Sequence, residues 1–309
     1  MISGLSASNQ QFLASLNILQ SNLSQADEEL SSGLSVNVAS DAPQSVQDIF
    51  VTRAELGEAT QSAQSLTNIQ GQVQSAGSAV QSAIELLNQA VSLGTEGAST
   101  SATLSTQQDL AAQVQALQAQ LVSISNTEVG GVYVFSGDAN GSPAYQVDAS
   151  SPTGVDQLIS PQQSTLQIAG PSGVTFQVSM TAQDLFDQQD SSGNPTANNA
   201  FAALNGLVQA LQSGSTANVT AAVGALQTAS SYVNDQTAFY GAAENNVSSA
   251  LDLAQKFQTQ DQTELSGLED ANATTVAVQL TQDSTAVNAA LSAEAHMPTS
   301  SLFDYIPLT

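Results

Sequence analysis

The sequence contains no cysteine and no tryptophan, and only two of its 309 residues are basic. Without cysteine the chain can form neither a disulfide nor a thiolate metal site. The two bases, Arg53 and Lys256, stand against 27 acids and leave a formal net charge of -25. Lysine and arginine make the contacts to phosphates, so this charge balance excludes binding to nucleic acid and to anionic membrane surfaces. Glutamate–lysine pairs cannot support the helices either, so packing must stabilise them.

Long apolar runs are also absent. No run approaches the roughly 18 apolar residues of a membrane-spanning helix, so membrane insertion is not expected. The first six residues lack the basic start and apolar block of a cleaved secretory signal. By that rule the chain would remain in the cytosol, although some export systems read no such signal.

Both ends of the chain carry a narrow apolar stripe. Between residues 12 and 34, and again between residues 276 and 291, apolar side chains recur every three or four residues, which is the heptad spacing of a helix that needs partner helices. Asp283 interrupts the second stripe. The two stripes predict that the chain returns to pair with its own beginning. The predicted assembly seam comprises Phe12, Leu16, Leu19, Leu23, Leu30, Val276, Leu280, Val287, Leu291, Leu302, Phe303 and Tyr305.

The N-terminal stripe has recognisable limits. Residues 1–11 are expected to fray, and Gly33 is expected to end the first helix. Ser40 or Asp41, followed by Pro43, is a typical start for the next helix.

The segments between the two terminal stripes also have a helical pattern. Three-four spacing predicts a helix through residues 66–90 that breaks at residues 94–97, and an antiparallel partner over residues 110–124. Residues 219–257 hold the same spacing and predict one helix of about 60 Å.

The middle of the chain has a different character. Short β-rich runs separated by glycine and proline occupy residues 131–137, 144–147, 165–168 and 174–178. The expected fold class is therefore mainly α: a long antiparallel, heptad-patterned helical bundle formed by the N- and C-terminal segments, with a small β-containing insert. The expected domains are a terminal coiled-coil assembly region (1–40 plus 265–309), a helical bundle core (41–137 plus 199–264) and a β-rich variable domain (138–198).

Residues that could support enzyme chemistry are few. His296 is the single histidine and has no motif around it, which favours an incidental solvent-facing residue. The acid runs at residues 27–29 and 269–270 fit a solvated helix face better than a catalytic pair, because thin bundles seldom offer a pocket. Residues 138–141 share part of the pattern of a calcium loop but lack its bidentate glutamate, so a turn is favoured. Enzyme activity, cofactors and bound metals are not expected.

The terminal stripes differ from the others because glycine breaks at Gly33 and Gly267 separate them from the bundle. A pair of short helices is marginal in water and buries too little surface for stability. We therefore expect the two ends to be poorly ordered in a single molecule and to become ordered when copies of the chain polymerise.

Several motifs resemble the flagellin superfamily over residues 5–135 and 200–305. The family's N-terminal signature is similar to residues 30–34 with Asn37 and residues 40–41, and its C-terminal signatures are similar to residues 240–246 and 265–272. Ser35 departs from the pattern, since the family usually has arginine there. The segments that are more similar to the hook–filament junction branch than to the filament flagellins are residues 41–43, 132–137 and 301–305.

The resemblance implies a structural subunit of the bacterial flagellum that joins hook to filament by helix-seam polymerisation. It also implies an extracellular location reached by type III export without a cleaved signal peptide. The implied partners are further copies, a neighbouring hook-associated protein, flagellin, and an export chaperone on the C-terminal region. A filament flagellin is the alternative, and a type III-secreted surface or binding protein is a more distant one.

The charge of -25 carries its own expectation. Copies packed side by side repel one another, and salt screens this repulsion only beyond about 8–10 Å. We therefore expect assembly to be favoured in acidic or salty surroundings, where carboxylates are neutralised or screened.

Overall fold

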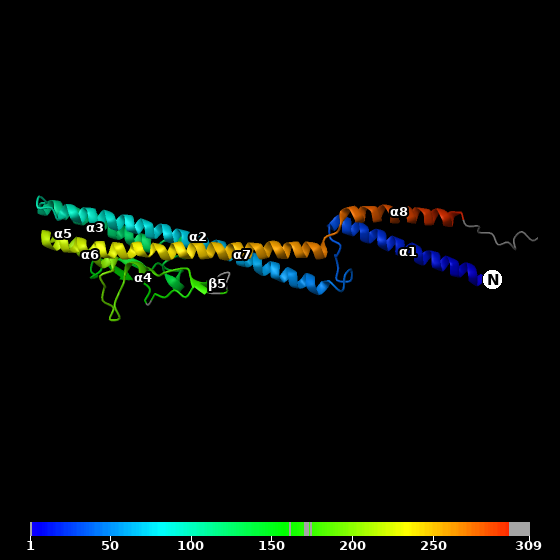
Figure 1. Cartoon of the computed structure of the whole chain (residues 1–309), viewed down its shortest axis with the longest axis horizontal. Coiled ribbons are helices and arrows are strands. Elements are labelled where there is room, and N and C mark those ends of the chain that lie inside the picture. The colour runs from blue at the N-terminus through cyan, green and yellow to red at the C-terminus, as the bar shows by residue number, and fades with distance from the viewer. Residues whose placement is uncertain (1, 161, 170–172, 174, 297–309) are drawn as a thin grey trace, which may run out of the picture. The chain divides into compact units, whose positions relative to one another are not determined.

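The computed structural model describes residues 2–160, 162–169, 173 and 175–296 (Figure 1). It is a mainly α structure, which confirms the predicted fold class. The helices are α1 (Ile2–Ser32), α2 (Val46–Gly97), α3 (Leu104–Ser125), α4 (Ala182–Phe186), α5 (Ala200–Gln212), α6 (Thr216–Asp235), α7 (Thr237–Glu269) and α8 (Ala273–Ala295), with a 3₁₀ turn η1 (Gly137–Ala139). The strands are β1 (Glu128–Val129), β2 (Val132–Tyr133), β3 (Tyr145–Val147), β4 (Val155–Gln157), β5 (Gln167–Ala169) and β6 (Thr175–Gln177).

The chain divides into two compact units. The terminal unit comprises residues 1–59 and 257–309, and the central unit comprises residues 60–256. Helices α2 and α7 each contribute residues to both units. The three domains expected from the sequence, with boundaries near residues 41, 138, 199 and 265, remain a prediction.

The core of the central unit follows the predicted stripes. The residues of the α2 stripe from Val73 to Ala90 are buried, and those of α3 share one core with them, because α3 turns back along α2 as the spacing predicted (Figure 1). Along α6 and α7 the stripe is largely buried from Val219 to Ala254, whereas Phe257 is exposed. Heptad spacing therefore identified the intrachain core of this unit correctly, because each stripe faces another helix with the same period.

The β-containing insert consists of three separate two-stranded antiparallel sheets, β1–β2, β3–β4 and β5–β6. Aromatic rings join it to the bundle. Phe135 packs edge-on against Phe186 with ring centroids 6.0 Å apart, and the ring of Tyr145 lies 5.1 Å from that of Phe201 in α5. Each of these four rings is essentially inaccessible to solvent, so the insert shares the core of the central unit.

Two helix starts differ from the prediction. Helix α1 begins at Ile2 and not near Phe12. Helix α2 begins at Val46 because the carboxylate of Asp41 does not cap it and instead accepts the amides of Asn37 and Val38.

Other predicted boundaries are also wrong. The expected single helix over residues 219–257 is two helices that meet at Gln236. Strand pairing starts at Glu128, ahead of the first expected β-rich run at residues 131–137, and β4 and α4 have no counterpart among the predicted elements. These short elements have no extended period that a pattern could reveal.

The predicted break at residues 94–97 is wrong as well, since α2 continues to Gly97. The glycines there allow close packing. A Cβ atom on Gly94 would lie 2.6 Å from Cγ2 of Val223 and 3.0 Å from Cδ1 of Leu207, and one on Gly97 would overlap the side chain of Leu211. Helices α5 and α6 therefore approach the end of α2 more closely than a larger residue would permit.

Candidate assembly surface

The predicted assembly seam lies on two helices of the terminal unit that run side by side and antiparallel, α1 and α8 (Figure 1). In the part of the seam that the structure describes, Val276 alone is buried, while Leu30 and Leu291 are exposed. The half-buried members are Phe12, Leu16, Leu19, Leu23, Leu280 and Val287. The structure thus brings these two stripes together and covers them only in part. Leu302, Phe303 and Tyr305 lie outside the described residues.

An acid lies within this helix pair. Asp283, which interrupts the second stripe, is buried. Both of its carboxylate oxygens accept hydrogen bonds from Nε2 of Gln279, each at 3.1 Å. A polar side chain one turn away therefore compensates for the burial of a charged group.

The two stripes are held at one end by backbone hydrogen bonds. Gly33 follows α1 with a φ of +75°, a left-handed conformation that favours glycine, so it ends the helix as the sequence predicted. Its carbonyl accepts from the amide of Ala271 at 2.9 Å. The amide and hydroxyl of Ser35 donate to the carbonyl of Glu269 at 2.6 and 3.0 Å. Asn272 caps α8 by accepting two amides of its first turn.

A charged contact supports the same connection. The guanidinium of Arg53, the single arginine in the sequence, lies 2.6 Å from the carboxylate of Glu269. The glutamate side chain is buried, whereas that of the arginine is half exposed. Arg53 thus neutralises a buried acid at the end of α7, beside the segment that leads into α8.

Exposed apolar side chains gather in the terminal unit. Among the described residues thirteen large apolar side chains are exposed, and nine of them lie in this unit, which is little more than a third of the chain. They are Leu13, Ile18, Leu30, Val38, Phe50, Val51, Phe257, Val278 and Leu291. Most of these residues stand outside the heptad stripes, so periodicity alone did not identify them. The concentration marks this unit as the candidate interaction surface of the chain.

The other candidates from the sequence have structural roles or none. His296 is exposed, with Nδ1 2.7 Å from the carbonyl oxygen of Ser292. The carboxylate of Asp138, in the loop that shares part of a calcium-binding pattern, accepts from the amide and hydroxyl of Thr165. Over residues 2–160, 162–169, 173 and 175–296 no cluster of three or more histidine and acidic side chains could hold a metal ion.

The described residues also bear on membrane insertion. None of the helices found there combines the length and apolar character needed to cross a bilayer.

Comparison with known proteins gives a family match and several similar folds. Residues 2–140, slightly less than half of the chain, match the family of the bacterial flagellin N-terminal helical region. No curated protein matches the chain in sequence. A structure described as a flagellar hook-associated protein from Vibrio parahaemolyticus has a TM-score of 0.62 and 18% identity, covering 74% of this chain and all of that one. Flagellar hook-associated protein 3 from Legionella pneumophila has a TM-score of 0.50 and 13% identity, covering 69% and 98%. At these identities the likeness establishes a shared fold.

Proposed function

We propose that this chain, whose N-terminal region matches the bacterial flagellin family, is a structural subunit of the flagellum that joins hook to filament. The observation that carries the proposal is the partly covered α1/α8 pair. Its seam remains half exposed in one molecule, and nine large apolar side chains are exposed on the terminal unit. Neighbouring copies would complete the burial, so polymerisation would cover the residues of the predicted seam.

The junction is favoured over the filament as the place of assembly. Two similar folds belong to hook-associated proteins, and residues 132–137 and 301–305 are more similar to that branch. The first of these motifs has a packing role here, because Phe135 is fully buried against Phe186. A filament flagellin is the alternative outcome of the experiment below.

Partners and location follow from the same proposal. The subunit would contact its own copies, a neighbouring hook-associated protein and the first flagellins, and a chaperone would hold its C-terminal region before export. It would work outside the cell and leave through the type III apparatus without a cleaved signal peptide. It would catalyse no reaction, since its function is to form contacts.

Electron microscopy of flagella isolated from the source organism tests the proposal, with the protein carrying a gold-labelled tag in the exposed loop near residue 192. The proposal predicts a few labels, all at the boundary between hook and filament. Labels along the whole filament would identify a flagellin instead. Their absence from flagella would contradict both functions and favour a secreted surface protein.

A further inference from the structure

The charge of this protein is distributed unevenly, and most of the α1/α8 pair is free of it. No charged residue occurs between Ile2 and Ala26 of α1, and the acids of that helix are confined to residues 27–29. In α8 the charged residues are Asp283, which is buried and hydrogen-bonded, and Glu294 near the end. The remaining 22 of the 27 acids lie elsewhere in the chain. Most of the exposed surface of this helix pair is therefore close to neutral in a molecule of charge -25.

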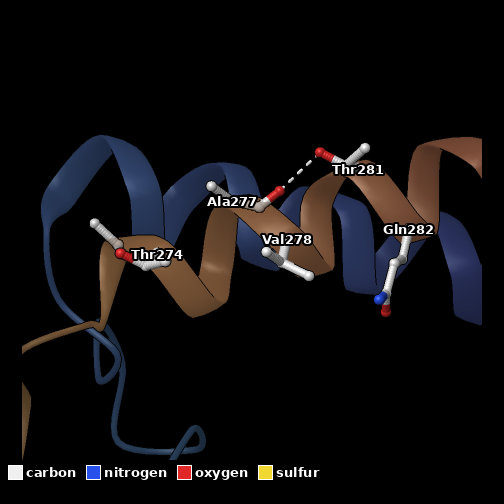
Figure 2. Close-up of a pocket in the computed structure, with 6 residues that line it drawn as sticks. Thr274, Ala277, Val278, Thr281 and Gln282 are labelled. Atoms are coloured by element: carbon white, nitrogen blue, oxygen red, sulfur yellow. Dashed lines mark hydrogen bonds between the residues drawn. The ribbon is translucent and has the colours of Figure 1, made fainter.

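The neutral surface of α8 contains an open groove of ≈ 630 Å³ (Figure 2). Figure 2 shows Val278 on the near side of α8 while α1 passes behind the helix. The exposed fractions agree, because Val278 is 53% exposed whereas Val276 is 7% exposed. Small side chains thus leave a hollow on the side of α8 that does not face α1. The lining residues are Ala273, Thr274, Ala277, Val278, Thr281 and Gln282.

Helix α1 also carries a large apolar side chain, Ile18, that protrudes from the helix pair. Ile18 is 61% exposed, the largest value among the apolar residues of α1 from position 10 onward, and its neighbours on that face are polar or small. At 100° per residue Ile18 is about 130° from the middle of the stripe that faces α8, whereas Leu13 is about 90° away on the other side. Ile18 therefore projects away from the intramolecular contact.

We propose that Ile18 of one copy inserts into the α8 groove of a second copy. The inference rests on the proposed function and names the contact through which polymerisation would proceed. The predicted seam then pairs α1 with α8 within one molecule, and its exposed parts are covered further once copies assemble. The contact between molecules begins with Ile18 and Val278, which lie outside that seam.

Electrostatics favours a second copy as the occupant. Two molecules of charge -25 repel one another wherever their acids meet, and neither the turn of α1 around Ile18 nor residues 273–282 of α8 contribute an acid to this contact. A basic partner would instead be drawn to the acidic remainder of the chain. Ile18 and the α8 groove lie on different surfaces of one molecule. Each copy can therefore bind one neighbour through its groove and another through its Ile18. Such a head-to-tail contact generates a ring or an open helix.

The test uses two full-length variants, Ile18→Lys and Val278→Glu, both at exposed positions. Under conditions in which the unchanged protein assembles, each variant alone should assemble roughly tenfold more weakly or worse, because a charge replaces a buried apolar side chain. Mixed in equal amounts, the two should recover assembly, since the lysine of one copy then meets the glutamate of the other. Sedimentation velocity measures assembly, and circular dichroism checks that both variants remain helical.

Leu13→Lys serves as the matched control, because it introduces the same charge on the same helix at a residue that is 56% exposed. Because it keeps both Ile18 and Val278, Leu13→Lys should assemble on its own as well as the unchanged protein does. A loss of assembly in Leu13→Lys as large as that in Ile18→Lys, or no recovery when Ile18→Lys and Val278→Glu are mixed, would overturn the proposed contact while leaving the proposed function intact. Failure of the unchanged protein to self-associate at any concentration or salt would contradict polymerisation itself.

Discussion

Arg53 and Glu269 form an ion pair in which Nη2 and Oε1 are 2.6 Å apart, with the carboxylate buried and the guanidinium half exposed. The same glutamate accepts the amide and hydroxyl of Ser35 at its backbone carbonyl. A chain with only two bases thus uses one of them where α1 and α8 are joined to the rest of the terminal unit. Ser35, which stands where the flagellin family usually has arginine, provides a neutral contact at the same place.

Replacing Arg53 by alanine should loosen this connection. The buried carboxylate would lose its partner, and with one member half exposed we expect the free energy of local opening to fall by about 1–3 kcal/mol. Hydrogen exchange at the amides of Ser35 and Ala271 should become faster by the factor to which this loss of free energy corresponds. Lys256→Ala is the control, because it removes the same charge from an exposed position of α7. Equal acceleration in both variants would mean that net charge, and not the ion pair, governs the effect.

Glycines of α2 should respond in opposite ways to alanine. Gly94→Ala would force its Cβ into Val223 and Leu207, so we expect a loss of about 1–3 kcal/mol in the free energy of unfolding. Gly57 lies in the same helix with no neighbouring atom within 4 Å of the position that a Cβ would occupy, so Gly57→Ala should stabilise by up to about 1 kcal/mol. Chemical denaturation of both variants measures the difference. A Gly94→Ala variant as stable as the unchanged protein would contradict the close helix approach.

Asp187 introduces a dependence of stability on pH. Its carboxylate is buried and accepts from Tyr145 Oη at 3.0 Å, Asn199 Nδ2 at 2.7 Å and Gln189 Nε2 at 2.8 Å. Burial raises the pKa of Asp187, and the three hydrogen bonds lower it by less. Burial of the Tyr145 phenol, together with the charge of Asp187, raises the pKa of that phenol.

Because the pKa of Asp187 is higher in the folded chain than in the unfolded one, the folded state binds this proton more tightly. The resulting stabilisation is complete below the unfolded pKa of about 4 and is lost as pH rises through the folded pKa. Relative to Asp187→Asn, the unchanged protein should therefore gain stability as pH falls from about 7 to about 4. Urea denaturation across this range measures the gain. If the unchanged protein instead lost stability relative to Asp187→Asn as the pH falls, the raised pKa of Asp187 would be contradicted.

Assembly of the full chain should depend on salt and acid even though most of the contacting surface is nearly neutral. The acids outside that surface repel over distances of about 10 Å at 0.1 M salt. Light scattering at neutral pH should show more polymer when salt rises to about 0.5 M, and more again near pH 4, where carboxylates are protonated. Equal assembly at neutral pH without added salt would show that repulsion between the acids does not limit polymerisation.

Sequence patterns predicted the helices that carry a periodic apolar stripe, and they missed local features that depend on one residue. The stripes through Val73 and Leu110 are buried as expected, since a periodic stripe requires a facing helix whatever its details. Gly94 was misjudged because glycine has the same signature in a helix break and in a close approach, and only the position of Val223 distinguishes the two. Nothing about Gln236 indicated that α6 and α7 are separate helices.

The candidate surface shows the same limit. Phe12 and Leu280 were identified because they repeat with a period, and the structure places them on the paired helices. Ile18 and Val278 were not identified from the sequence, because a single apolar residue among polar ones forms no periodic pattern. Their exposure became informative only when the fold showed which side of each helix faces its partner.

Hydrogen exchange of α1 and α8, followed in dilute monomer and in assembled protein, would show whether neighbouring copies complete the terminal unit. We predict rapid exchange along both helices in the monomer, with the central unit protected, and strong protection of both helices after assembly. If α1 and α8 are already as protected as the central unit in a dilute monomer, completion by neighbouring copies is contradicted.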